Sequence, residues 1–332
     1  LTLTYNKILL FLSLFSYGLC SEGDRSPYYQ NCLRQCVKDR CTSGAVKKTT
    51  KDIPPIPTLW SCDDNCRYYC MFDTVDRFEE RGFQIPKFHG KWPIRRVYGI
   101  QEPASVFGSI LNLVANAYMY SKMRSKFPVR TMPVVLFWHA FAWICMNAWV
   151  WSIVFHTRDV YFTEFMDYSG ALSMVMSLFV AAVIRAKKLV SVIILATLLY
   201  YAEHVRYLYS GRIDYDYNMH VNLFFGVVGS LIWILWAWRE LAAGRRHAWR
   251  LLAFTALSAM ALTLEVFDFP PKYYAWDAHA LWHLSTAPLP LLFYRYPPFW
   301  FLKLFDERSE TWLHSQDTRY KINGFHCFAP YT

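Results

Sequence analysis

Charged residues are scarce in this chain. They make up 18% of its 332 residues, whereas 55% are hydrophobic and 19% are aromatic. Soluble domains usually carry about 25% charged residues, so the shortage excludes an ordinary cytosolic enzyme. Long apolar runs between residues 104 and 294 also exclude a disordered or fibrous chain. The composition therefore predicts an all-α polytopic membrane protein.

The net charge of +10 at pH 7 resembles that of a nucleic-acid-binding protein. Much of the excess Lys and Arg, however, lies in short segments between apolar runs, where positive charge sets the orientation of membrane spans. We therefore expect no nucleic-acid partner. The chain also lacks an Asn-x-Ser/Thr sequence, so N-linked sugars cannot report its topology.

The first twenty residues have the pattern of a secretory signal peptide. Lys7 precedes an apolar stretch of about ten residues, and small and polar residues follow up to Cys20. A membrane anchor is the alternative, but the run is shorter than the roughly 20 residues that cross a bilayer. We expect residues 1–20 to be a signal peptide and the chain after it to lie in the lumen.

Six of the nine cysteines fall within the next stretch, residues 21–102. In an oxidising compartment such a set predicts three disulfides, for which 15 pairings exist. A zinc site is the weaker alternative, because secreted modules rarely use thiolate ligands. We expect a small, cysteine-rich lumenal domain and two free thiols at Cys145 and Cys327. The six cysteines are Cys32, Cys36, Cys41, Cys62, Cys66 and Cys70.

Seven apolar stretches follow and predict a transmembrane domain of seven helices over residues 103–294, with a cytosolic tail over residues 295–332. Most are long enough to cross a bilayer, although the fourth must extend through Glu203 and His204 or tilt little. The stretches cover residues 104–121, 133–155, 168–184, 189–202, 221–238, 249–267 and 278–294.

The basic residues of the loops support this orientation. With a lumenal cysteine-rich domain, the first, third and fifth loops are cytosolic and carry eleven Lys and Arg residues, against four in the lumenal loops. The eleven are Lys122, Arg124, Lys126, Arg130, Arg185, Lys187, Lys188, Arg239, Arg245, Arg246 and Arg250, and the four are Arg158, Arg206, Arg212 and Lys272.

Five polar residues at the lumenal ends of the spans form a candidate site. Ser152 and His156 share one helix face at the end of the second span, and His279 and His283 share one at the start of the seventh. Asp167 lies at the start of the third span. Ionisable residues are costly in a bilayer, so this concentration in one leaflet indicates a functional site.

Three histidines can bind zinc and leave its fourth position open for water, as in catalytic zinc sites. Asp167 could then act as general base and proton donor, and Ser152 could donate a hydrogen bond to the developing oxyanion. Spacing alone leaves a second interpretation open, in which the histidines only form hydrogen bonds with a neighbouring helix or a lipid headgroup.

Other polar residues on the lumenal side are expected to have structural or supporting roles. Glu102 is interpreted mainly as the start of a helix whose first turn contains Pro103. The alternative is that it supports the site by a hydrogen bond or binds another ion. The remaining candidates are Glu203, His204, His220, Glu265 and Asp268.

Two blocks of sequence resemble the Per1-like family, whose members remodel the lipid of GPI anchors. One is Gly-Asp-Arg-Ser-Pro at residues 23–27, together with the cysteine triplets. The other is Lys-Phe-His-Gly-Lys-Trp-Pro-Ile-Arg-Arg-Val-Tyr-Gly-Ile-Gln-Glu-Pro-Ala-Ser-Val at residues 87–106. The family belongs to the CREST superfamily of seven-span hydrolases, whose Ser, Asp and three His match Ser152, Asp167, His156, His279 and His283.

The resemblance implies a zinc-dependent hydrolase in the Golgi membrane, with His156, His279 and His283 as zinc ligands. The implied reaction is phospholipase A2-type removal of the sn-2 acyl chain from the lipid of GPI-anchored proteins. Two alternatives remain at this stage. One is a non-catalytic seven-span receptor or chaperone for GPI-anchored cargo, and the other is a ceramidase-like amide hydrolase.

Overall fold

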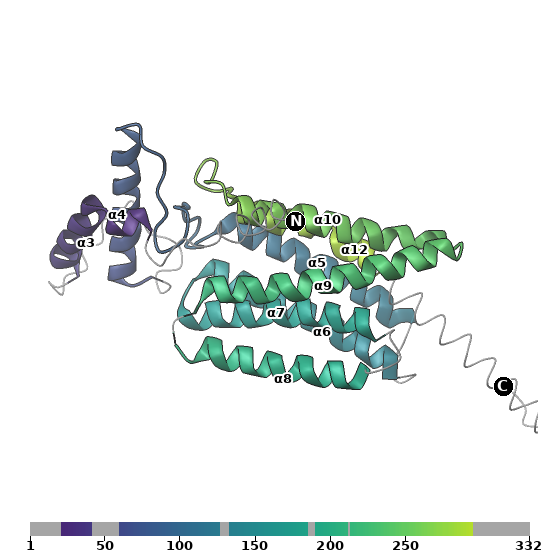
Figure 1. The fold of residues 1–332 in the computed structure, drawn as a ribbon. Helices are drawn as coiled ribbons and strands as arrows, with labels where there is room; N and C mark the ends of the chain where they lie inside the picture. Colours follow the sequence, from purple (N-terminus) through teal and green to yellow (C-terminus); the bar gives the residue numbers. More distant parts are fainter. Residues whose placement is uncertain (1–20, 42–59, 127–132, 185–189, 212, 295–332) are drawn as a thin grey trace, which may run out of the picture.

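The computed structural model describes residues 21–41, 60–126, 133–184, 190–211 and 213–294 (Figure 1). The expected signal peptide at residues 1–20, the tail at residues 295–332 and Cys327 lie outside the described residues. Within the described residues the regular elements are helices, accompanied by three isolated β-bridges. The all-α prediction is confirmed for this part of the chain.

The N-terminal region folds into a small helical head held by three disulfides. It contains α2 (Glu22–Arg25), α3 (Pro27–Arg40) and α4 (Cys62–Glu79). The α4 cysteines are spaced by four residues and therefore share one face, which lies against α3. The bonds join Cys32 to Cys70, Cys36 to Cys66 and Cys41 to Cys62.

These bonds decide between the two interpretations of the cysteines. The sulfur atoms of Cys41, Cys62 and Cys66 lie close enough together to suit a metal ion. All three are nevertheless committed to disulfides, so none is a thiolate that could bind zinc. The prediction of a disulfide framework is therefore confirmed.

The remaining helices form a bundle beside the head (Figure 1). Four of them are long and apolar enough to cross a membrane, namely Val135–Thr157, Tyr161–Val183, Tyr215–Ala242 and Arg246–Phe267. The bundle consists of α5 (Pro103–Lys126), α6 (Pro133–Thr157), α7 (Tyr161–Val183), α8 (Val190–Tyr209), α9 (Tyr215–Ala242), the short η1 (Arg246–Ala248), α10 (Trp249–Phe267), α11 (Ala278–Thr286) and α12 (Leu289–Phe293).

Three helix boundaries differ from, or refine, the sequence-based expectation. Helix α7 starts at Tyr161, so Asp167 lies in its second turn and not at its first residue. Helix α8 runs to Tyr209 and so includes Glu203 and His204, as its short apolar run required. The seventh apolar stretch is divided into α11 and α12 around Pro288, because proline cannot continue the hydrogen-bond ladder of a helix.

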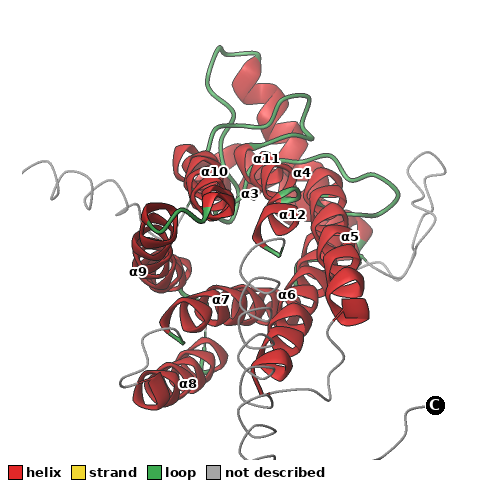
Figure 2. Ribbon diagram, turned by 90° about the vertical axis from the view of Figure 1, so that its right-hand side faces the viewer, coloured by secondary structure: helices red, strands yellow, loops and turns green. Residues whose placement is uncertain are grey.

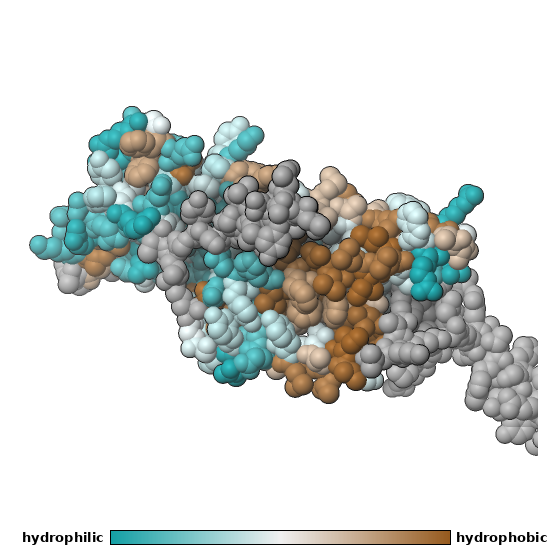
Figure 3. Space-filling model, viewed as in Figure 1, coloured by the Kyte–Doolittle hydropathy of each residue, from teal (hydrophilic) through white to brown (hydrophobic). Residues whose placement is uncertain are grey.

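The largest buried apolar cluster of the described residues lies away from the head. The largest buried apolar cluster includes Met123, Trp138, Trp233 and Leu251, which all lie near the helix ends remote from the head. Figure 3 shows apolar residues gathered on the side of the bundle, whereas the head is largely hydrophilic. Viewed along the bundle, α5, α6, α11 and α12 lie together on one side (Figure 2).

Candidate metal centre

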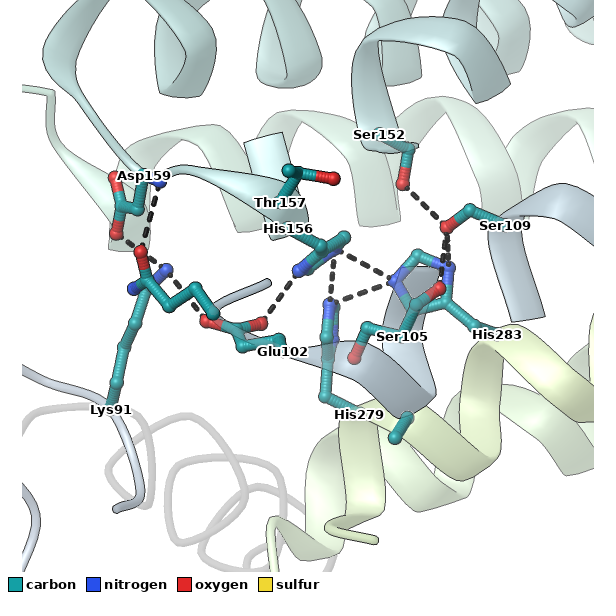
Figure 4. A network of polar contacts seen from close by, with 12 residues as sticks. Lys91, Glu102, Ser105, Ser109, Ser152, His156, Thr157, Asp159, His279 and His283 are labelled. Atoms are coloured by element: carbon teal, nitrogen blue, oxygen red, sulfur yellow. Dashed lines mark hydrogen bonds and ion pairs between the residues drawn. The ribbon is translucent and has the colours of Figure 1, made fainter. Parts of the chain in front are cut away.

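Three histidine side chains meet at the head-side end of the bundle (Figure 4). His156 comes from the last turn of α6, and His279 and His283 come from α11. The Nε2 atom of His283 lies 3.0 Å from Nε2 of both His156 and His279, and the Nε2 atoms of His156 and His279 are 3.4 Å apart. His156 and His283 are almost completely buried. The structure thus brings the three predicted histidines together in a group that could hold a metal ion.

Each of the three rings is held from its other nitrogen. Nδ1 of His156 lies 2.6 Å from Oε2 of Glu102, and Nδ1 of His279 lies 2.7 Å from Oε2 of Glu265. Nδ1 of His283 lies 3.2 Å from Oγ of Ser109. The rings are therefore oriented by Glu265 in α10, by Ser109 in α5 and by Glu102, the residue just before α5. Such supporting groups commonly orient histidines around bound metals.

These contacts fix which nitrogen carries the proton. A carboxylate only accepts hydrogen bonds, so His156 and His279 donate from Nδ1 to Glu102 and Glu265. Ser109 gives its hydroxyl hydrogen to the backbone oxygen of Ser105 over 2.8 Å, so it must accept from Nδ1 of His283. In the neutral rings, all three Nε2 atoms then present lone pairs to one another.

Such an arrangement suits a cation. Three lone pairs at about 3 Å repel one another unless a positive charge lies between them. Zinc bound tetrahedrally at about 2.0–2.1 Å from each nitrogen would set the nitrogens about 3.3 Å apart. The observed 3.0–3.4 Å are close to this value, so the residues fit a three-histidine zinc site.

Glu102 belongs to a charged network that reaches the linker between head and bundle. Nζ of Lys91 lies 3.2 Å from Oε1 of Glu102 and 2.6 Å from Oδ2 of Asp159. Burial would raise the pKa of Glu102, but the charge of Lys91 and the hydrogen bond from His156 outweigh it and hold that pKa well below its usual range. Glu102 is therefore an anion next to the ring of His156.

Glu265 has a corresponding partner on another helix. The hydroxyl of Tyr215, the first residue of α9, donates to Oε1 of Glu265 over 3.1 Å. The other carboxylate oxygen of Glu265 accepts from His279. Glu265 is thus fixed at both oxygens, and the ring of His279 is fixed with it.

Close packing of α5 on α11 fixes the position of His283. A Cβ atom added at Gly108 would lie 2.7 Å from Cβ of His283, which leaves no room for a larger residue. Nδ2 of Asn112 donates to the backbone oxygen of His283 over 2.7 Å, next to the end of α11. Gly108 therefore allows α11 to approach α5 closely, and the hydrogen bond from Asn112 holds α11 in that position.

The head and its linker dock onto the same end of the bundle. Arg158, two residues after His156, bonds Oδ2 of Asp64 in α4 over 2.7 Å. Asp268, just beyond α10, pairs with Lys87 and accepts from Nε1 of Trp92 over 2.7 Å. The supporting role expected for Asp268 is therefore the attachment of the linker to the bundle.

The two remaining site residues of the sequence analysis lie around the cluster. Oγ of Ser152 is 3.0 Å from Oγ of Ser109, and it donates to Ser109 because the hydrogen of Ser109 is used elsewhere. The carboxylate of Asp167 in α7 lies within electrostatic range of His156 in α6 and of His279 in α11. Their catalytic roles remain predictions.

Sequence reasoning missed part of the arrangement around the histidines. Glu102 does precede the first turn of α5, as expected, but the less favoured alternative also holds, because Glu102 contacts His156. Ser109 and Lys91 were not singled out at all. For Ser109 a signal existed, because its spacing of seven from Glu102 puts both on one face of α5. For Lys91 none existed, because its contacts depend on the tight turn between Phe88 and Lys91.

The fold and the site together define a class: a helical membrane protein with a largely buried three-histidine centre at one end of its bundle. Comparison with known sequences assigns the family. Residues 56–298 match the Per1-like family, and this chain belongs to that family.

Similar proteins extend the match to most of the chain. Post-GPI attachment to proteins factor 3 of Drosophila melanogaster is 40% identical over 300 residues, covering 86% of this chain and 91% of its own. The proteins named GPI-specific phospholipase A2-like PGAP3 are 39% identical in both Danio rerio and Homo sapiens. They cover 83% and 87% of this chain, and 89% and 92% of their own length. No solved structure matches.

Proposed function

We propose that this protein is a GPI-specific phospholipase A2 that removes the sn-2 acyl chain from the lipid of GPI-anchored proteins. The observation that carries the proposal is the convergence of three Nε2 atoms, each on a ring whose Nδ1 is already bonded. The names of the relatives support the choice of lipid. In the reaction, water breaks the bond between the acyl carbon and the glycerol oxygen, giving a fatty acid and a lysolipid.

His156, His279 and His283 would hold the zinc ion. When bound, zinc would supply Lewis-acid polarisation of the ester and would lower the pKa of water. Asp167 is assigned as the base that takes the proton of the attacking water and then returns it to the glycerol oxygen. Its electrostatic interaction with His156 and His279 supports this assignment.

Ser152 is retained as a catalytic residue in the proposal. In its present contact it donates to Ser109, which accepts from His283, so it contributes to the orientation of the ring. Donation to the oxyanion, the role that its position in the sequence indicates, would require its hydroxyl to turn away from Ser109. The activity of Ser152→Ala, with zinc content measured beside it, tests which role matters.

The proposed placement is a seven-span protein of the Golgi membrane, with a lumenal head and a cytosolic tail from residue 295. Four of the seven spans would be the helices that are long and apolar enough to cross a membrane. The other three would be α5, α8 and the α11–α12 pair. His156 and His279 lie within two residues of helix ends. An sn-2 ester lies just below the lipid headgroup, so it would be at about the depth of these ends.

The proposal is tested with detergent-purified protein. Elemental analysis should find about one zinc per chain, and mass spectrometry should detect the fatty acid and the lysolipid released from a GPI-anchored substrate. We expect His156→Ala, His279→Ala and His283→Ala each to lose metal and turnover together. Asp167→Asn should keep the metal and lose most of the turnover.

The outcomes separate the competing functions. Folded protein without metal or acyl release, which still restores GPI-anchored proteins in deficient cells, would indicate a receptor or chaperone. Release of fatty acid from ceramide but not from a GPI lipid would indicate an amide hydrolase. Variants of all three histidines that work as well as the wild type in cells would rule out the proposed site.

A further inference from the structure

Ser105 lies on the face of α5 that runs along the histidine cluster. Glu102, at the start of that face, contacts His156, and Ser109, one turn after Ser105, contacts His283. Spacings of three and four residues place Ser105 between them on the same face. Figure 4 shows the Ser105 side chain directed from α5 toward His279. Its position therefore borders the centre on the α5 side.

The hydroxyl of Ser105 is buried without a bond. The residue is 1% exposed, and its Oγ has no hydrogen-bond partner among the residues that the structure describes. Most serines and threonines in these helices donate to a backbone oxygen one turn earlier, as Ser109 does to Ser105. A buried hydroxyl left unpaired is costly, so a partner supplied by a ligand is a physical reason for its orientation.

The neighbouring hydroxyls are already committed. Ser109 gives its hydrogen to the backbone oxygen of Ser105, and Ser152 gives its hydrogen to Ser109. Three serine hydroxyls lie beside the cluster. Among the described residues, the hydroxyl hydrogen of Ser105 is the one of these three that has no acceptor. It is the available donor on this side of the centre.

We propose that Ser105 is a catalytic residue whose Oγ donates a hydrogen bond to the carbonyl oxygen of the ester bound at the three-histidine centre. The bond strengthens as negative charge develops on that oxygen, which lowers the barrier to attack by water. This role deepens the proposed function and rests on it. Ser152, in its observed contact, then orders Ser109 and His283.

The experiment compares Ser105→Ala with a matched serine. Ser169 in α7 is also buried, its Oγ also has no partner among the described residues, and its backbone oxygen also accepts from another residue, Tyr201. Each variant is purified in detergent. The measurements are zinc content, kcat and KM for acyl release from a GPI lipid, and the Kd of a palmitoyl hydroxamate, which offers a carbonyl oxygen in place of that of the ester.

For Ser105→Ala we expect one zinc per chain, an unchanged KM and a kcat reduced about 100-fold, as for loss of one oxyanion donor. The hydroxamate should bind about tenfold more weakly, because one hydrogen bond is lost. Ser169→Ala should match the wild type in all measurements. Ser105→Cys, with a weaker donor of similar shape, should give an intermediate kcat.

Two results would overturn the inference. One is a Ser105→Ala variant with wild-type kcat and hydroxamate affinity. The other is loss of zinc in Ser105→Ala, which would make Ser105 part of the support of the histidines. If wild-type protein releases no acyl chain at all, the proposed function fails, whereas the hydroxamate comparison still decides whether Ser105 faces the ligand.

Discussion

Oε2 of Glu102 accepts a hydrogen bond from Nδ1 of His156 over 2.6 Å, so a residue at the start of α5 fixes a ring at the end of α6. The backbone adds a second tie between the same residues, because the amide of Glu102 donates to the carbonyl of His156 over 3.0 Å. Glu102 is therefore bound to His156 by both its side chain and its main chain.

Replacing Glu102 by glutamine should weaken zinc binding without unfolding the protein. The amide keeps the size of the side chain but removes the charge that supports the ring, and loss of such a partner typically costs 10- to 100-fold in metal affinity. Competition with a chelator measures the affinity. Glu240→Gln is the control, because Glu240 is also buried but pairs with Arg245 at the opposite end of the bundle. Equal zinc affinity in both variants would contradict the role of Glu102.

Lys91 should act on the centre through Glu102. Its ammonium bonds Oε1 of Glu102 and leaves Oε2 for His156, so Lys91→Met frees the carboxylate to turn. We expect a several-fold loss of zinc affinity, smaller than that of Glu102→Gln. The double variant should lose no more than Glu102→Gln alone, since both residues act along one path. Additive losses in the chelator titration would show that Lys91 acts independently.

Much of the fold could be predicted from the sequence because it depends on local patterns. The six cysteines predicted the disulfide framework, but not the pairing, since 15 pairings are compatible with one sequence. The i, i+4 pair of His279 and His283 was recognisable because both lie on one helix. The split between α11 and α12 lies at Pro288, a residue type that cannot continue the hydrogen-bond ladder of a helix.

The contacts that hold the site could not be predicted in the same way. Ser109 meets His283 only because Gly108 lets α5 and α11 approach closely, and helix approach is not encoded in one segment. Glu265 was one of several acidic candidates. Its hydrogen bond with His279 forms because α10 packs against α11, which the sequence alone does not show. Such pairings depend on tertiary packing, which spacing along the chain does not specify.

Removing the Cys41–Cys62 disulfide should loosen the head and leave the centre intact. The bond closes a loop across a sequence separation of 21, so the chain-entropy estimate for its loss is about 3 kcal/mol. In Cys41→Ser/Cys62→Ser we expect faster hydrogen exchange in α3 and α4, measured by mass spectrometry. Zinc content should stay at one per chain, because α6 and α11 carry the ligands. Loss of zinc would show that the head is needed to hold the histidines together.

Gly108→Ala should disrupt the centre through a single methyl group. The added Cβ would lie 2.7 Å from Cβ of His283 and 3.0 Å from its backbone carbon, so α11 must move away from α5. That movement takes Nε2 of His283 away from the other two nitrogens, and we expect at least a tenfold loss of zinc affinity and of acyl release.

Gly226→Ala is the matched control: Gly226 lies inside α9, and an added Cβ meets nothing within 4 Å. In a helix interior this change should be neutral or stabilise by about 0.5–1 kcal/mol. If chelator titration gives Gly108→Ala the same zinc affinity as Gly226→Ala, close approach of α5 to α11 does not position His283.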